Sequence, residues 1–229
     1  MTTPPADSEL SRLLSLASHE LRTPISVVAG YLRMVLKDPA GTLDERHRRM
    51  LEETDKSCAR LSAIVAEISD LSALERGAAS FKRAPIDVRT VLGNAIAGLP
   101  PLVDRTVDVE LTTGSAAAVI QGDGPRLQTA LTSVLHALRR EVVSSEKLVV
   151  QDRVAPYQGN QASWIAIAEV GNFDTVSGSN VDDLTTFDEW RGGCGLSLAI
   201  ARRIIERHHG AIWSLASGIK AAAVIALPH

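Results

Sequence analysis

The first third of the chain is marked by apolar and small residues whose spacing alternates between four and three. This alternation is typical of the seam of a packed helical bundle, and it predicts a long helix from Asp7 or Ser8 to about Lys37. The stripe consists of Leu10, Leu14, Ala17, Leu21, Pro24, Val28, Tyr31 and Val35. Turn residues at 38–41 then end the helix.

A similar stripe predicts a second long helix, which ends near Arg76 and Gly77, where a glycine suits the C-terminal cap. Its members are Leu51, Thr54, Cys58, Leu61, Val65, Ile68 and Leu71. Thr42 and Glu45 have the spacing of a capping box at the start of this helix.

A single helical hairpin has too little core to be stable by itself. Two copies would complete a four-helix bundle, so we expect a homodimer through residues 8–76. The alternative is that the hairpin packs against the rest of its own chain. The length and regularity of both stripes favour the dimer.

After a short linker, the pattern changes to mixed helix and strand. Asp87 is placed to cap a helix over 88–99, and Pro125 opens a helix that runs to about Val142. We expect a further helix at 195–207, a polar functional loop at 171–194, and strands at 107–111, 117–121, 147–154, 163–170, 211–215 and 221–227. The fold class is therefore α+β. Residues 8–77 form the helical hairpin, and residues 84–229 form a sandwich of one sheet with helices on one face.

Composition excludes several classes of function. The 229 residues are 45% apolar and 22% charged, as in an ordinary globular protein. A net charge of -3 and only 3% aromatic residues argue against a nucleic-acid partner. Two separated cysteines favour a reducing compartment, and no apolar run approaches the roughly 20 residues of a spanning helix. We therefore expect a cytoplasmic protein with no membrane segment in this chain.

His19 lies outside the expected helical seam. With Leu14 and Leu21 at core positions, its ring points to solvent, where an imidazole can act as a nucleophile. Glu20 is placed to accept a proton or to orient the ring, and Thr23, one turn further, can position a water molecule. An isolated His–Glu pair would usually be no more than a charged helix surface.

The segment SHELRTPI at 18–25 resembles the H-box of sensor histidine kinases. Weaker resemblances follow in the family's order: 122–127 is similar to the entry of its N-box helix, 185–190 to its F-box, 193–200 to its second glycine box, and 204–213 to the segment after it. The resemblance covers about residues 8–228. It implies a dimeric four-helix bundle followed by an α/β sandwich of the histidine kinase ATPase type.

The resemblance also implies roles for individual residues. His19 would accept the γ-phosphoryl group of ATP and pass it to an aspartate in the receiver domain of a response regulator. Glu20 would be the acid/base partner, and Thr23 would serve when the same protein dephosphorylates the regulator. The nucleotide-binding positions would be Ser133, Arg140, Glu169, Gly171, Gly193 and Gly195, with ATP and Mg²⁺ as cofactors if the kinase step survives and no cofactor otherwise.

The sequence departs from the family at the nucleotide site. The N-box helix of the family carries two asparagines one turn apart, of which the second helps to hold Mg²⁺. These positions are Ser133 and Ala137 here, and a shift by one residue gives Thr132 and His136. Because alanine cannot ligate a metal, we expect that no metal ligand is retained. Phe173 also stands where the first glycine box has a glycine, and it adds bulk where the chain of the family curves around the nucleotide.

Three functions remain open. The favoured one is a phosphotransfer or phosphatase protein that exchanges phosphoryl groups between His19 and response regulators, with an eroded ATP site. The alternatives are a fully active ATP-dependent sensor kinase and a non-enzymatic pseudokinase scaffold. Intact His19, Glu20 and Thr23 speak against the scaffold, and Ala137 speaks against the active kinase.

Overall fold

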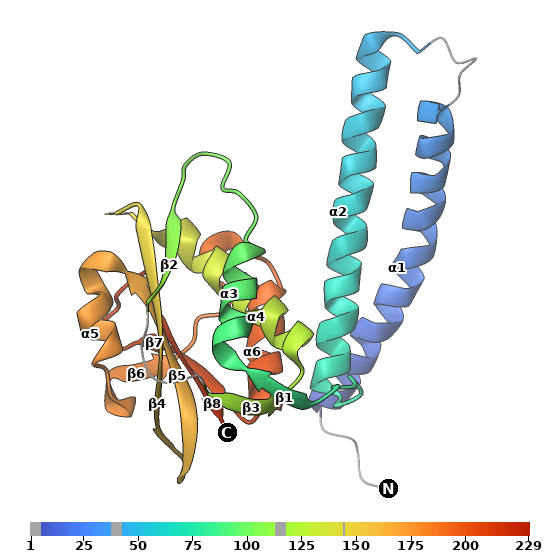
Figure 1. Cartoon of the computed structure of the whole chain (residues 1–229). Coiled ribbons are helices and arrows are strands. Elements are labelled where there is room, and N and C mark those ends of the chain that lie inside the picture. Colours follow the sequence, from blue (N-terminus) through green and yellow to red (C-terminus); the bar gives the residue numbers. More distant parts are fainter. Residues whose placement is uncertain (1–5, 38–42, 113–117, 144) are drawn as a thin grey trace, which may run out of the picture. The chain divides into compact units, whose positions relative to one another are not determined.

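The computed structural model describes residues 6–37, 43–112, 118–143 and 145–229. The chain divides into two compact units, one ending at Ala79 and the other spanning Ser80–His229. The first is helical and the second contains all the strands (Figure 1). This matches the expected order of a helical hairpin followed by a mixed α/β domain.

The first unit is a hairpin of two long helices, α1 (Ala6–Lys37) and α2 (Glu45–Glu75). Asp44 caps α2, because its carboxylate accepts a hydrogen bond from the backbone N–H of His47 at 2.9 Å. Helix α2 begins at Glu45, directly after this cap. The capping box expected at Thr42 lies outside the described residues, as does the turn at 38–41. At the other end, Gly77 adopts a φ of 69°, as expected for a C-terminal glycine.

The two helices contact each other through small residues. On α1 the buried or half-buried positions are Ser11, Leu14, Ser15, Ser18, Ile25, Ala29, Gly30, Leu32 and Leu36. The hydroxyl of Ser72 on α2 donates to the carbonyl oxygen of Ser11 at 2.5 Å. Most of the expected apolar stripe lies on a different face of α1: the exposed fraction is 59% for Leu10 and 64% for Tyr31. The helix thus has one narrow contact face within the hairpin and a second apolar face that the hairpin leaves uncovered.

The second unit is built on a six-stranded sheet in the order β2-β4-β5-β8-β7-β6, in which only β2 and β4 pair in parallel. Its strands are β2 (Asp108–Thr112), β4 (Lys147–Tyr157), β5 (Asn160–Glu169), β6 (Leu184–Thr186), β7 (Ala211–Leu215) and β8 (Ala223–Pro228). A separate antiparallel pair, β1 (Ala84–Asp87) and β3 (Val119–Gly122), connects the linker to the sandwich.

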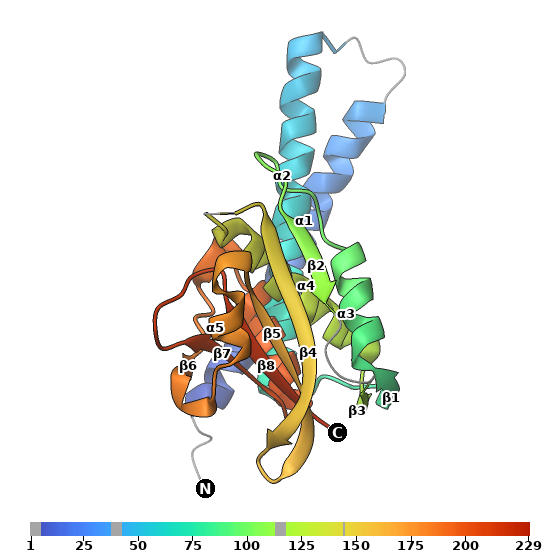
Figure 2. The same cartoon turned by 60° about the vertical axis from the view of Figure 1, so that its left-hand side comes forward.

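Three helices cover one face of the large sheet: α3 (Val88–Ala97), α4 (Gly124–Glu141) and α6 (Ser197–Arg207) (Figures 1 and 2). Asp87 caps α3 and Asp123 caps α4, as the sequence predicts for the first of these. The fully buried side chains of this layer include Leu127, Leu131, Leu135, Leu138, Leu198, Ile204 and Ile205 from the helices and Ile165, Ile167 and Ile225 from the sheet.

The opposite face of the sheet is covered as well, which corrects the expected arrangement of helices on one face. The short helix α5 (Phe173–Ser177) lies there, with Val176 buried against Ala166 and Ala168 of β5 (Figure 1). The rings of Trp164 and Trp213 stack beside it, with centroids 5.6 Å apart. β5 is apolar on both faces and therefore needs cover on both.

The segment 171–194, expected to be a loop, contains several short elements instead. Besides α5 and β6 it includes three-residue 3₁₀ turns at Val170–Asn172, Val181–Asp183 and Arg191–Gly193. Polar and glycine residues hid these elements, because each is too short for a periodic pattern.

Candidate phosphoacceptor and nucleotide sites

His19 lies on the outer face of α1. Its side chain is 76% exposed and that of the neighbouring Glu20 is 74% exposed, with 3.7 Å between Nδ1 of His19 and Oε1 of Glu20. Thr23, one turn further along the helix, is exposed too. The second ring nitrogen, Nε2, is therefore open to a molecule that approaches from solvent. The arrangement supplies an accessible nucleophile with a carboxylate near its other nitrogen.

The residues next to His19 explain its orientation. Ser18 is buried against the hairpin interior, and its hydroxyl donates to the carbonyl oxygen of Leu14 at 2.7 Å. Successive side chains on a helix are about 100° apart, so the ring after Ser18 is turned away from the interior. Pro24 lies inside α1 and has no N–H to donate, which leaves the carbonyl of Glu20 without its usual helical donor.

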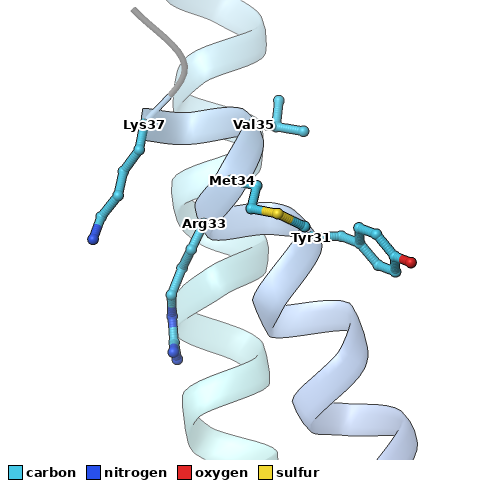
Figure 3. A pocket seen from close by; sticks show the side chains of 5 residues that line it. All are labelled: Tyr31, Arg33, Met34, Val35 and Lys37. Atoms are coloured by element: carbon cyan, nitrogen blue, oxygen red, sulfur yellow. The ribbon is translucent and has the colours of Figure 1, made fainter.

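A shallow hollow lies on the same helix near its C-terminal end. Figure 3 shows its lining, which comes from α1 alone: Tyr31, Arg33, Met34, Val35 and Lys37. Arg33 pairs with Asp55 of α2 at 3.5 Å. Met34 is 60% exposed, so the hollow is a part of the uncovered apolar face of the hairpin rather than an enclosed binding cavity.

Helix α4 carries the positions expected to hold nucleotide and metal. Ser133 is half-buried, Ala137 is fully buried and Arg140 is exposed. Gly192 lies directly on Ala137: a Cβ atom placed on Gly192 would be 3.0 Å from both the Cβ and the carbonyl oxygen of Ala137. The structure therefore brings the second glycine box against the N-box helix, with no space between them at position 137.

The remaining glycine-box residues are less constrained. Gly193 and Gly195 have φ angles of 59° and 61°, in the left-handed region that favours glycine. Arg140 reaches the carbonyl oxygen of Gly193, 3.5 Å from its Nη1. Gly171 is exposed at the end of β5, and nothing lies within 4 Å of the place a Cβ would take. Glu169, just before it, is buried.

The sequence analysis missed an ion pair next to Ala137. Arg191 and Glu141 meet with 3.0 Å between Nε and each carboxylate oxygen, and Nη2 of Arg191 also contacts Oε2 of Glu141. The arginine side chain is only 9% exposed and the glutamate 18%. Fifty positions separate the two residues, and no local pattern signals such a pairing. The one weak sequence signal for this ion pair is that Arg191 directly precedes Gly192 and Gly193.

His208 is a structural residue of the second unit. It is buried, its Nε2 accepts from the backbone N–H of Asp123 at 2.9 Å, and its Nδ1 donates to the carbonyl of Ile204 at 2.7 Å. Burial holds the pKa of this imidazole below its usual 6.5. Asp123 in turn accepts from the backbone N–H of Lys82, so His208 and Asp123 fix both the start of α4 and the end of the linker.

The residues at the N-box position do not fit a metal-bound triphosphate. Alanine offers no ligand for Mg²⁺, and the backbone of Gly192 already occupies the surface of Ala137. Across the described parts of the chain, no three histidine, cysteine, aspartate or glutamate side chains gather in a way that could hold a metal ion. Within those same parts, no helix is long and apolar enough to cross a membrane.

Comparison with known protein families identifies the domain type of the first unit. Residues 9–77 match the model of the His Kinase A (phospho-acceptor) domain, and His19 lies within the match. Residues 9–77 are therefore identified as a phosphoacceptor domain of the histidine kinase type. The recognition made from the H-box is thereby confirmed.

Curated histidine kinase relatives align over both units of this chain. The cell-division control histidine kinase PdhS of Brucella ovis is 23% identical over 88% of this chain and 21% of its own length. Sensor protein KdpD of Escherichia coli K12 is 25% identical over 87% of this chain and 22% of its own, and sensor protein GacS of Pseudomonas syringae is 26% identical over 88% and 23%. The chain thus spans about a fifth of the length of these relatives.

Solved histidine kinase structures share the fold. Full-length ShkA, in complex with AMPPNP, superposes with a TM-score of 0.66 at 22% identity over 95% of this chain and 45% of its own. Acinetobacter baumannii AdeS gives a TM-score of 0.52 at 22% identity over 92% of this chain and 97% of its own. Both support the expected fold class of a helical hairpin followed by an α/β sandwich.

Proposed function

We propose that this chain carries a phosphoryl group on His19 and exchanges it with an aspartate in the receiver domain of a response regulator. The observation that carries the proposal is the contrast between an open His19 and a sealed position 137. His19 is 76% exposed beside Glu20, whereas Ala137 is fully buried beneath Gly192.

The transfer step uses this chain's own residues. Nε2 of His19 attacks the phosphorus of an aspartyl phosphate; the N–P bond forms, the acyl O–P bond breaks, and the aspartate leaves as a carboxylate. The imidazole must then release the proton on Nδ1, and Glu20, 3.7 Å away, is the acceptor or stabilises the positive ring until solvent takes the proton. The reverse reaction returns the phosphoryl group to a regulator.

Thr23 is assigned to the phosphatase direction. Its exposed hydroxyl lies one turn from His19 on the same face of α1, within reach of a water molecule between the helix and a docked receiver domain. The water would attack the aspartyl phosphate, release inorganic phosphate and regenerate the carboxylate.

The proposal includes a homodimer through residues 8–76. Large apolar side chains remain exposed along both helices of the hairpin, including Leu13, Leu16, Leu21, Val27, Val28, Tyr31, Met34, Leu61 and Ile64. A stripe of this length is more than a monomeric surface normally exposes, and a second hairpin would cover it in a four-helix bundle. We assign residues 8–77 to dimerisation and phosphotransfer and residues 84–229 to a lobe that derives from an ATP-binding domain.

Further parts of the proposal concern location and partners. We place the chain in the cytoplasm, with response regulators as its partners; Cys58 and Cys194 are free cysteines, which suits a reducing compartment. Nucleic acid is not among the proposed partners.

A second candidate, an ATP-dependent sensor kinase, is favoured by one observation: the AMPPNP complex of ShkA has the same fold. If ATP is used, Ser133, Arg140, Glu169, Gly171, Gly193 and Gly195 are the positions that would bind it. The burial of Ala137 weighs against this candidate. The pseudokinase scaffold is a third reading, and the exposure of His19 and Glu20 weighs against it.

Transfer from a labelled receiver tests the proposal. A panel of purified receiver domains, each labelled at aspartate with ³²P from acetyl phosphate, is mixed with the full chain and with His19→Ala. The proposal expects acid-labile label on the wild-type chain, or rapid loss of label from at least one receiver, with His19→Ala inactive in transfer. A wild type that neither accepts nor hydrolyses any label would leave the scaffold reading.

A further inference from the structure

The contact between Gly192 and Ala137 requires something to hold it closed. Gly192 has a φ of 65°, and its Cα region lies against the Cα, Cβ and carbonyl oxygen of Ala137. Glycine is needed at 192 both for this backbone angle and for the lack of a Cβ. Any side chain larger than alanine at 137 would push the glycine segment away. The two residues are complementary in size and leave no space for a ligand between them.

The ion pair of Arg191 and Glu141 fastens this segment at its start. Besides the contacts to Glu141, Nη1 of Arg191 donates to the carbonyl oxygen of Ala222 at 3.1 Å, and the backbone N–H of Ala221 donates to Oε2 of Glu141 at 3.2 Å. The guanidinium also lies over the ring of Phe187, 5.8 Å from its centroid. The pair therefore ties the glycine segment to both α4 and the sheet.

This pair differs from the surface ion pairs of the same unit. Lys147 and Glu110, for example, meet with side chains that are 46% and 50% exposed, and such pairs contribute little to stability. Arg191 is 9% exposed, and its charge and hydrogen-bonding groups are satisfied by carboxylate and carbonyl oxygens. Removal of one partner from a pair this buried leaves an uncompensated charge, so the contact is expensive to open.

We propose that Arg191 and Glu141 form an intramolecular latch that holds residues 191–193 closed over Ala137, so that the chain's own atoms occupy the place where a metal-bound triphosphate would lie. The inference rests on the proposed descent of residues 84–229 from an ATP-binding domain. It extends that proposal, because the nucleotide site would then lack its metal ligand and would also be occupied by residues 191–193. It does not depend on phosphotransfer by His19.

Hydrogen exchange measures the latch directly. The full-length Arg191→Ala variant is compared with wild type, with Arg202→Ala as the matched control. Arg202 also pairs with glutamates, but with Glu189 and Glu206 instead of Glu141. Opening the latch should speed amide exchange in the peptide covering 190–196 by at least about tenfold and leave β5 unchanged. Arg202→Ala should leave that peptide protected. Unchanged exchange at 190–196 in Arg191→Ala would overturn the latch.

A double-mutant cycle measures the coupling between position 137 and the ion pair, which would be absent if the ion pair only stabilised the fold. Ala137→Asn alone must displace Gly192 against the latch, whereas in the Arg191→Ala background the segment is already loose. The loss of Tm caused by Ala137→Asn should therefore be smaller in that background, and additive losses would contradict the proposal. If Arg191→Ala does not fold, Glu141→Gln replaces it, since the amide keeps the shape of the carboxylate.

Nucleotide binding separates this inference from the proposed function. Calorimetric titration of wild type with Mg²⁺ and AMPPNP should show no binding, whatever the outcome of phosphotransfer from receivers. Binding by wild type with no change in exchange at 190–196 would overturn the latch and leave phosphotransfer by His19 untouched.

Discussion

The proposed function depends on two positions, His19 and Ala137, and their surroundings are opposite. The ring of His19 is 76% exposed on a helix whose own turns orient it, with Glu20 adjacent in sequence. Ala137 is fully buried under a glycine that comes from a distant part of the chain. A phosphoryl carrier needs only one accessible face of one helix. A nucleotide site needs several segments held apart, and once a metal ligand is lost those segments can close on each other.

The largest effects are expected at the open site. Glu20→Gln keeps the shape of the side chain but cannot accept a proton, so transfer from a labelled receiver to His19 should slow by about 10²-fold.

Thr23→Ala should retain transfer and lose most of the hydrolysis of phosphorylated receiver. Single-turnover assays with ³²P-labelled receiver measure both rates, and Ser26→Ala, on the same exposed face, is the control. Equal effects of both variants on both rates would contradict the separate roles.

The next effect concerns the uncovered apolar face through which we propose that the hairpin dimerises. Val28 is 48% exposed on that face, and Val28→Glu would place a charge in the proposed bundle core. The dimer dissociation constant should rise by at least about 100-fold, since each buried valine contributes roughly 1.5 kcal/mol or more and two copies are changed. Analytical ultracentrifugation measures it, and Ser26→Glu should leave it unchanged. A Val28→Glu protein that remains fully dimeric would argue against this face.

A smaller effect is expected at the sealed site. Ala137→Asn restores the family's amide but overpacks the contact with Gly192, and it should destabilise the second unit by about 1–3 kcal/mol. The same change at Ala97, an exposed residue at the end of α3, should cost much less. Urea unfolding followed by tryptophan fluorescence compares the two. Equal losses would show that position 137 is not sealed.

The smallest effect is a pH dependence confined to the second unit. Burial keeps His208 neutral in the folded state, with a pKa below 6.5, so the unfolded chain binds the proton more readily. Stability is therefore fully present above about pH 6.5 and falls as the pH drops towards the folded pKa. His136, whose pKa is also lowered by burial and by Arg140 and Arg139, acts in the same direction.

His208→Gln should flatten this slope in part. Urea unfolding at intervals between about pH 8 and pH 5 gives the slope. A wild-type stability that rises on acidification would contradict the assignment.

How much the sequence predicts differs between the two units. The hairpin, its ends near Lys37 and Glu75, and the exposure of His19 follow from helical periodicity and capping residues, which are local properties. The order of the main strands and helices of the second unit follows in the same way. Periodicity indicates that a segment is a strand, but it does not identify the strands with which that segment pairs. The apolar residues on both faces of β5 predict that both faces are covered, but they do not identify α5 as the element that covers the second face.

The sealed site could be predicted only in part. The sequence shows an alanine at position 137, where the resemblance predicts an asparagine. The position of Gly192 on that alanine depends on how residues far apart in sequence pack, and the pair of Arg191 and Glu141 spans fifty positions. Buried ion pairs of this kind are set by tertiary contacts and have no spacing rule.

One experiment compares the two sites within a single protein. The full chain and His19→Ala are incubated in parallel with [γ-³²P]ATP and Mg²⁺ and with a ³²P-labelled receiver domain that exchanges with the wild type, and acid-labile label on the chain is measured over time. The account predicts label on wild-type His19 from the receiver, none from ATP, and none on His19→Ala from either donor. Strong labelling of the wild type from ATP that His19→Ala abolishes would contradict it, because position 137 would then admit a working nucleotide site.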